Sequence, residues 1–97
     1  MADTSVSAAP MSIEHEADRF VASVNGIEAR LDYRLDGERM VITHTDVPDA
    51  ISGQGVAGRL TRAAFEHARA QGWKVQPACA YAAGWAERHP EHASLLA

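Results

Sequence analysis

A glycine-containing segment, Ser52–Ala57, is the first part of the chain whose residue types indicate a binding site. Gly53 and Gly55 allow backbone conformations that turn amide N–H groups toward a ligand. The helical pattern that follows adds unpaired N–H groups and a partial positive charge at its first turn. Such a segment favours an anion, and a pyrophosphate would suit it. On spacing alone, an ordinary turn before a helix explains the same residues, since the lysine of a P-loop and the third glycine of a dinucleotide fingerprint are absent.

Cys79 is the only thiol in the chain and stands just before a second predicted helix. A helix N-terminus favours the thiolate, which is the nucleophilic form of cysteine. Cys79 is therefore a candidate nucleophile. A small buried hydrophobic side chain is the structural alternative.

His44 lies near the end of a predicted strand, where an imidazole could act as a general base. Strict alternation along that strand places His44 on the same face as Ile42 and Asp46. Asp46 is a weaker candidate base. A histidine that simply hydrogen-bonds a neighbouring carbonyl is the alternative for His44.

The remaining histidines and aromatic residues indicate structure more than chemistry. His67 falls at the centre of the apolar face of the first predicted helix, so we expect a partly buried, hydrogen-bonded histidine there. His89 and His92 are three residues apart, but a proline separates them and no third ligand is evident, so no metal site is expected. Tyr81 and Trp85, one helical turn apart, are expected in the core.

Three strand patterns precede the glycine segment. The apolar run Arg19–Val24 is followed by the turn signal Asn25-Gly26, and Ile27–Leu35 then alternates apolar and charged residues without a break. A second turn signal, Asp36-Gly37, leads to a third strand over Met40–Val47. These patterns predict an antiparallel meander of three strands.

The second half of the chain predicts helices on either side of one more strand. A helix is expected over Gly55–Gln71, followed by a strand over Trp73–Pro77, a helix over Tyr81–Arg88 and a short last turn over Glu91–Leu96. A strand, a crossover helix and a strand place the fourth strand parallel to the third. The fold class is therefore α+β, with a mixed sheet, a crossover helix and a C-terminal helix.

The composition bounds the partners of this 97-residue chain. Residues 1–12 show no periodicity and predict a flexible N-terminal segment, so residues 13–97 form one domain. The net charge of −4, without a basic cluster, speaks against nucleic acid or an anionic membrane as a partner. A single cysteine, no long apolar run and no basic-apolar leader pattern predict a cytoplasmic protein.

The motif order strand, Gly-x-Gly-x-Ala, helix, strand resembles the acyl-CoA-binding core of the GCN5-related N-acetyltransferase superfamily. Its phosphate loop reads Gln/Arg-x-x-Gly-x-Gly/Ala, and Ser52 stands here at the Gln/Arg position. The chain is similar to the small single-domain subgroup often labelled YjdJ-like. The segments that carry this likeness are His44–Pro48, Gly53–Ala57, Pro77–Tyr81 and Arg88–Glu91. Together they cover roughly residues 15 to 96.

The resemblance implies acetyl-CoA as the acyl donor and assigns residues to it. It places Cys79 near the thioester, where Cys79 could accept the acetyl group and pass it on or lie beside a direct transfer, and Tyr81 could border the acyl group. The strand near Thr45–Val47 would pair with the pantetheine amides, and N–H groups from Gln54 through Gly58 would hold the pyrophosphate. The third and fourth predicted strands would splay apart around the cofactor. The implied cofactor-binding residues are Thr45, Asp46, Val47, Gly53, Gln54, Gly55, Val56, Ala57 and Gly58.

The predicted function is transfer of an acetyl group from acetyl-CoA to an amine on a small molecule or a protein, with Cys79 and His44 as candidate catalytic residues. The alternative is a module that binds CoA or acyl-CoA, or another protein, without turnover. No metal is expected. An open acceptor side on so small a domain is compatible with a homodimer.

Overall fold

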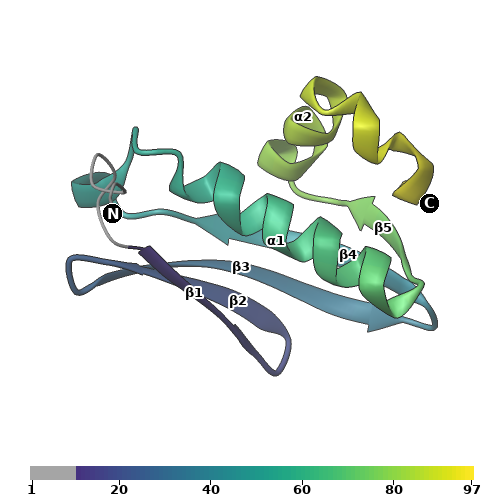
Figure 1. The fold of residues 1–97 in the computed structure, drawn as a ribbon, viewed down its shortest axis with the longest axis horizontal. Helices are drawn as coiled ribbons and strands as arrows, with labels where there is room; N and C mark the ends of the chain where they lie inside the picture. Colours follow the sequence, from purple (N-terminus) through teal and green to yellow (C-terminus); the bar gives the residue numbers. More distant parts are fainter. Residues whose placement is uncertain (1–10) are drawn as a thin grey trace, which may run out of the picture.

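The computed structural model describes residues 11–97, which form a five-stranded sheet and two α-helices (Figure 1). The strands follow the chain across the sheet: β1 (Met11–Glu16), β2 (Arg19–Val24), β3 (Ile27–Asp36), β4 (Arg39–Asp46) and β5 (Lys74–Pro77). Neighbours are antiparallel from β1 to β4, and β5 is parallel to β4. This confirms the predicted α+β fold with a mixed sheet.

Strand β1 was not predicted, so the antiparallel part of the sheet has four strands and not three. Met11 and Ser12, assigned above to the N-terminal segment, belong to β1; the rest of that segment, residues 1–10, lies outside the described residues. β1 pairs only with β2 and offers only Met11 and Ile13 as half-buried apolar side chains. An edge strand with so little buried surface carries a weak hydrophobic pattern.

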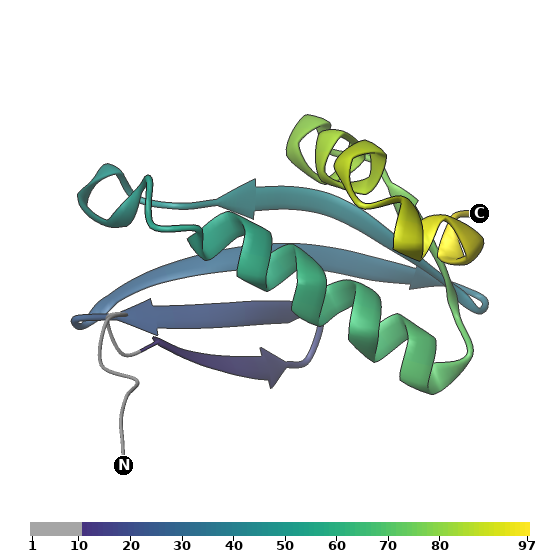
Figure 2. The same ribbon diagram turned by 45° about the horizontal axis from the view of Figure 1, so that its top comes forward.

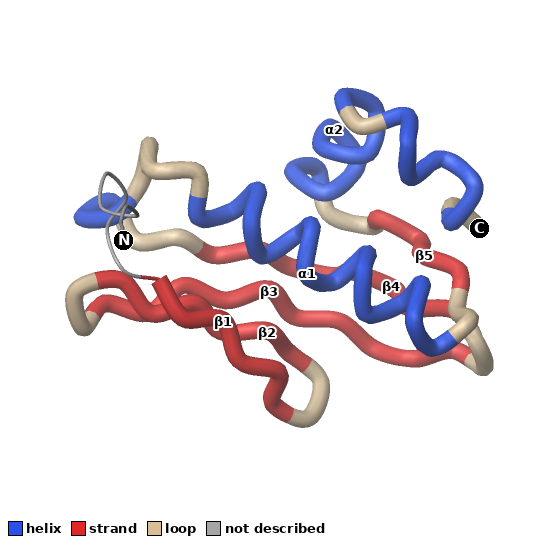
Figure 3. Tube along the Cα trace, in the orientation of Figure 1, coloured by secondary structure: helices blue, strands red, loops and turns tan. Residues whose placement is uncertain are grey.

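Two helices complete the fold, one before β5 in the chain and one after it. Helix α1 (Val56–Gln71) connects β4 to β5 and packs mainly on β2 and β3, while α2 (Ala80–Arg88) packs beside β4, β5 and α1 (Figures 2 and 3). Short 3₁₀ turns, η2 (Asp49–Ile51) and η3 (Pro90–Leu95), precede α1 and follow α2. Neither α-helix in the described part of the chain is long and apolar enough to cross a membrane.

The core lies between α1 and one face of the sheet. Its fully buried side chains include Leu31, Ile42, Leu60 and Phe65. On the other face of the sheet, Glu28 and Arg30 of β3 are exposed. We call this second face, with the charged side chains of β2, β3 and β4, the open face.

A bulge in β4 changes which side chains reach each face. Tyr33 pairs with Ile42, but Asp32 pairs with His44, so Thr43 has no partner in β3. Because one extra residue reverses a period-two pattern, His44 turns to the open face and Thr45 joins Ile42 on the helix side. The prediction that His44 shares a face with Ile42 is therefore wrong.

Candidate functional site

Strands β4 and β5 diverge close to the bulge. They pair only over Arg39–Ile42 and Lys74–Pro77. The chain then turns toward α2, and the carbonyl oxygen of Ile42 accepts the N–H groups of Ala78 at 2.9 Å and Cys79 at 3.1 Å. Beyond this point, no strand within residues 11–97 pairs with the β5 side of β4. Backbone groups there are free to bind an extended ligand, as the splayed strands predicted from sequence would require.

Cys79 lies at the point where the two strands diverge. It is the N-cap of α2, and its Sγ accepts the N–H of Ala82 at 3.4 Å. The same Sγ lies 3.5 Å from Oγ1 of Thr45 on β4. The half-buried thiol thus bridges the end of β4 and the start of α2.

The glycine segment forms a loop whose backbone requires glycine at two positions. Gly53 and Gly55 have φ of +79° and +76°, values that residues other than glycine rarely adopt. Gly55 is the N-cap of α1 and supplies no capping side chain, and the first turn contains no acidic residue. Among the described residues, no acceptor bonds the N–H groups from Gly53 to Gly58. Helix N-termini of this kind attract anions.

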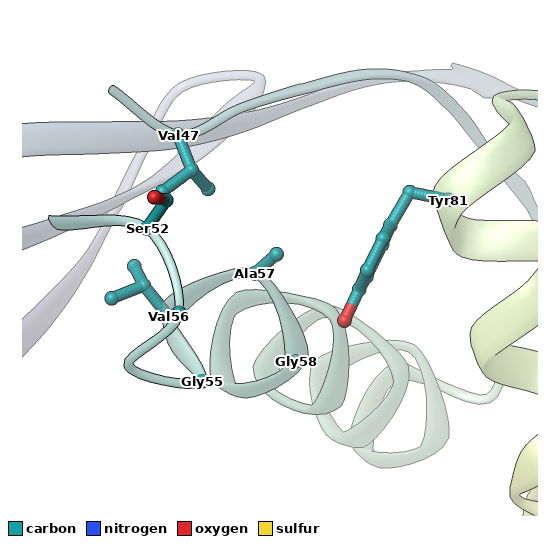
Figure 4. Close-up of a pocket in the computed structure, with 8 residues that line it drawn as sticks. Val47, Ser52, Gly55, Val56, Ala57, Gly58 and Tyr81 are labelled. Atoms are coloured by element: carbon teal, nitrogen blue, oxygen red, sulfur yellow. The ribbon is translucent and has the colours of Figure 1, made fainter. Parts of the chain in front are cut away.

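These amides border a cavity of about 240 Å³ (Figure 4). Its lining residues are Val47, Ser52, Gly53, Gly55, Val56, Ala57, Gly58 and Tyr81. Six of these were assigned to cofactor binding from the sequence. The others of that set, Thr45, Asp46 and Gln54, do not line it. Gln54 is exposed, and Asp46 lies on the open face beside Arg30.

Tyr81 forms the opposite wall of this cavity, as Figure 4 shows. A Cβ atom at Gly58 would lie 3.4 Å from the Tyr81 hydroxyl and 3.7 Å from Nε1 of Trp85. Gly58 therefore lets α2 approach the first turn of α1 closely. Tyr81 stays 37% exposed while Trp85 is buried, so only the tyrosine of the pair is accessible to a ligand.

The two candidate catalytic residues are not in contact with each other. Cys79 contacts Thr45, whereas the neighbouring His44 is exposed beside Asp32 on the open face. Asp46 lies on the same face as His44. Among the described residues, no side-chain hydrogen bond links His44 to Cys79 or to Tyr81.

The other histidines are engaged in packing. Half-buried His67 packs on the rings of His15 and Trp73, with centroids 4.4 and 5.4 Å away, instead of the hydrogen bond that we expected. Burial and the nearby His15 lower the pKa of His67. His89 Nδ1 donates to the Trp85 carbonyl oxygen, and His92 Nδ1 accepts from Arg69. Within residues 11–97, no three His, Cys, Asp or Glu side chains are arranged to hold a metal.

Comparisons with known proteins place the chain in a family. Residues 19–95 match the family model of the GCN5-related N-acetyl-transferases. Protein NATD1 of chicken (Gallus gallus) is 34% identical over 86 residues, covering 84% of this chain and 78% of that protein. Protein NATD1 of human (Homo sapiens) is also 34% identical over 86 residues, covering 84% of this chain and 76% of that protein.

A solved structure with the same fold supports this assignment. A GCN5-like protein of Staphylococcus aureus, determined by NMR in solution, superimposes with a TM-score of 0.73 at 29% identity, covering 89% of this chain and 87% of that one. The chain therefore belongs to the GCN5-related N-acetyltransferase family. Its fold and family are those of acyl-transfer proteins.

Proposed function

We propose that this protein transfers the acetyl group of acetyl-CoA to the nitrogen of an amine. The observation that carries the proposal is the run of unbonded amides at the start of α1. It borders a cavity beside the point where β4 and β5 diverge. Amides at an uncapped helix N-terminus fit a pyrophosphate, and an unpaired strand edge fits the amides of a pantetheine arm.

In this proposal, backbone groups bind the donor. N–H groups from Gln54 to Gly58, with the positive end of the α1 dipole, hold the pyrophosphate. The backbone of Thr45–Val47 pairs with the pantetheine amides on the side of β4 that lacks a strand partner. Ser52, at the position of the family's Gln or Arg, contributes little, since its hydroxyl already donates to the Asp49 carbonyl oxygen.

Bound acetyl-CoA supplies a thioester, from which an amine takes the acetyl group: a C–N bond forms, the C–S bond breaks, and the amine loses a proton while the thiolate gains one. His44 accepts the amine's proton from the open face. The Tyr81 hydroxyl, which lines the cavity, donates the proton to the leaving thiolate. Acid and base would then act from opposite sides of β4.

Cys79 offers a second route for the same overall reaction. As the N-cap of α2, Cys79 holds its sulfur at the first turn of that helix, where it accepts the N–H of Ala82. In a two-step transfer the Cys79 thiolate would displace CoA, forming an acetyl-thioester that the amine then cleaves. Intact-mass spectrometry after incubation with acetyl-CoA separates the routes. An adduct of one acetyl group on the wild type, absent from Cys79→Ala, indicates the two-step route. No adduct, with CoA binding confirmed separately, leaves direct transfer or a non-catalytic binding module.

Calorimetric titration with CoA and acetyl-CoA tests the donor site directly. We expect saturable binding of both, because the pyrophosphate and pantetheine contacts do not involve the acetyl group. Absence of binding would overturn the proposal.

Thioester cleavage then separates an enzyme from a binding module. Release of free CoA in the presence of an amine, reduced in His44→Ala or Cys79→Ala, supports catalysis. Binding without release would favour the alternative, a non-catalytic CoA-binding or interaction module. The exposed His44 and the open face suit either function, so the rate is the deciding measurement.

The charge of −4 and the single cysteine support a cytoplasmic protein that binds neither nucleic acid nor membranes. A homodimer also remains a proposal, which sedimentation would test.

A further inference from the structure

Strand β1 is held to the rest of the molecule by few side chains. It pairs only with β2 among the described strands and forms one edge of the sheet, where Figure 2 shows it as the darkest strand. Met11, Ile13 and His15 alternate along its helix side, and only the first two are apolar. Edge segments with few buried contacts open locally before the rest of a fold does. The attachment of β1 therefore depends strongly on His15.

His15 joins β1 to three other elements. Its ring stacks on Phe20 of β2, with centroids 4.5 Å apart and an interplanar angle of 10°. Its Nε2 shares a hydrogen bond with the Tyr33 hydroxyl of β3. The ring of His67 on α1 lies edge-on to it, with centroids 4.4 Å apart. We call His15, Phe20, Tyr33 and His67 the histidine cluster.

The cluster brings two imidazoles together without a counter-charge. Among the described residues, neither His15 nor His67 takes part in an ion pair. Glu66 and Arg69 are the charged residues of α1 nearest to His67 in sequence, and they are engaged with each other and with His92 of η3. Their charges are therefore already compensated away from β1.

The other groups that face the two imidazoles carry no positive or negative charge. Burial and Asp18 raise the pKa of Tyr33, so its phenol stays neutral, and its hydroxyl also lies 3.3 Å from the Ala17 carbonyl oxygen. β2 contributes Phe20, and the segment after α1 contributes Trp73. Asp18, in the β1–β2 turn, forms no ion pair with either imidazole. Nothing in the cluster thus offsets a positive charge on both histidines.

Protonation acts against the closed arrangement in two ways. Two imidazolium rings in contact repel each other, and burial penalises the charged form of the half-buried His67. When β1 leaves the sheet, His15 leaves with it and water reaches His67. The open form therefore binds protons more readily than the closed form, so acid shifts the equilibrium toward it.

We propose that the histidine cluster makes β1 an acid-released strand, which stays paired with β2 near neutral pH and detaches as the pH falls. The inference does not depend on acetyl transfer. Release leaves the donor cavity intact, since no residue of β1 lines it. It uncovers the edge of β2, whose backbone groups are then available to another strand.

Native-state hydrogen exchange of the ¹⁵N-labelled protein, followed by NMR, tests the proposal. The measured quantity is the protection factor, which corrects for the effect of pH on intrinsic exchange. Amides that pair β1 with β2 should lose up to about tenfold in protection between about pH 7.5 and 5.5, the limit for one linked proton. Amides of α1 should stay better protected at both pH values. Protection of β1 that is unchanged or higher in acid, or equal to that of α1 throughout, would overturn the inference.

Three single variants identify the groups responsible. His15→Gln and His67→Gln should each remove most of the pH dependence of β1 protection, because one partner of the imidazole pair no longer titrates. The change with pH is the readout, so a general loosening of β1 does not obscure it. His44→Gln is the matched control: it removes an exposed imidazole on the open face and should behave as the wild type does. PH dependence that persists in His67→Gln would overturn the assignment to this cluster. Failure of the proposed function would appear instead as loss of CoA binding, which leaves this measurement unaffected.

Discussion

The two sides of β4 differ in the chemical groups that line their cavities. On the helix side, the donor cavity, proposed above to bind acetyl-CoA, is lined by a glycine loop and by the amides at the start of α1, so backbone groups supply its polarity. On the open face, a cavity of about 170 Å³ is lined mainly by the charged side chains of Glu16, Arg19, Glu28, Arg30 and Asp46. A substitution readily alters a side-chain site, whereas a backbone site changes only when the chain path changes.

The two sides of β4 should therefore differ in how they tolerate substitution. The backbone site depends on Gly53 and Gly55, whose positive φ values few other residues tolerate. The open face has no comparable backbone requirement at Glu28 or Arg30, which are exposed residues of a regular strand. Three of the predictions below test this contrast through activity and binding, and the fourth through stability.

The largest effect is expected for Tyr81→Phe. Removing the hydroxyl that lines the donor cavity should lower kcat about 100-fold, because the leaving thiolate loses its proton donor. The Kd of CoA should change little, since phenylalanine keeps the ring and loses only the hydroxyl. Steady-state kinetics and calorimetry on the same preparation check both values. An unchanged kcat would remove Tyr81 from the mechanism.

Gly55→Ala should weaken CoA binding about tenfold. The added Cβ meets no atom within 4 Å, so the cost arises from the φ of +76° and not from a clash. Forcing a non-glycine residue into this region costs about 1–2 kcal/mol, which the loop can relieve by turning its amides away from the ligand.

Gly37→Ala is the matched control, since Gly37 also has a positive φ, +64°, and open space around it, but lies in the β3–β4 turn. Both variants should lose similar stability in denaturant unfolding, and only Gly55→Ala should lose CoA affinity. Equal CoA affinities would contradict a backbone-built donor site.

Most of the fold follows from local signals in the sequence. The turns at Asn25-Gly26 and Gly37 have the positive φ values that such dipeptides favour, and they fix the β2–β3 and β3–β4 hairpins. Two features depend on tertiary structure instead. β1 is an edge strand with little buried surface, and the bulge at Thr43 leaves the alternating pattern of residue types intact while reversing the faces.

The candidate site, like the fold, could be predicted from the sequence only in part. The glycine loop is recognisable because its chemistry lies in the backbone and only glycine permits it. Tyr81 was expected mainly in the core, because two aromatic residues one helical turn apart, here Tyr81 and Trp85, are typical of a buried helix face. Its place over Gly58 depends on how closely α2 approaches α1, and the only local signal was a glycine within the first turn of the helix. The roles assigned to Cys79 and His44 stay predictions.

His44→Gln should have a smaller effect than Tyr81→Phe, about a tenfold decrease in kcat. His44 is exposed on the open face, so water can partly replace it as the proton acceptor. Glutamine keeps a polar side chain beside Asp32 but cannot take up a proton. The Kd of CoA should not change, because the donor cavity lies on the helix side. A loss of CoA affinity in this variant would show that the two sides of β4 are not independent.

The smallest effect concerns His67, which lies on the helix side and lines neither cavity. Burial and the nearby His15 lower the pKa of His67 from its ordinary value of 6.5. The unfolded chain therefore binds this proton more readily than the folded chain does. The stabilisation is fully present above pH 6.5 and is lost as the pH falls through that value.

The free energy of unfolding, measured by urea denaturation between pH 7.5 and about 5, should decrease with a slope that is a fraction of the roughly 1.4 kcal/mol per pH unit given by one fully linked proton. His67→Gln should reduce this slope, because glutamine does not titrate. Since the His67 ring contacts His15 of β1, the same variant also reports how the edge strand is held against α1. A slope equal to that of the wild type would mean that His67 is protonated equally well in the folded and unfolded chains. Acid loss of stability would then arise elsewhere in the molecule.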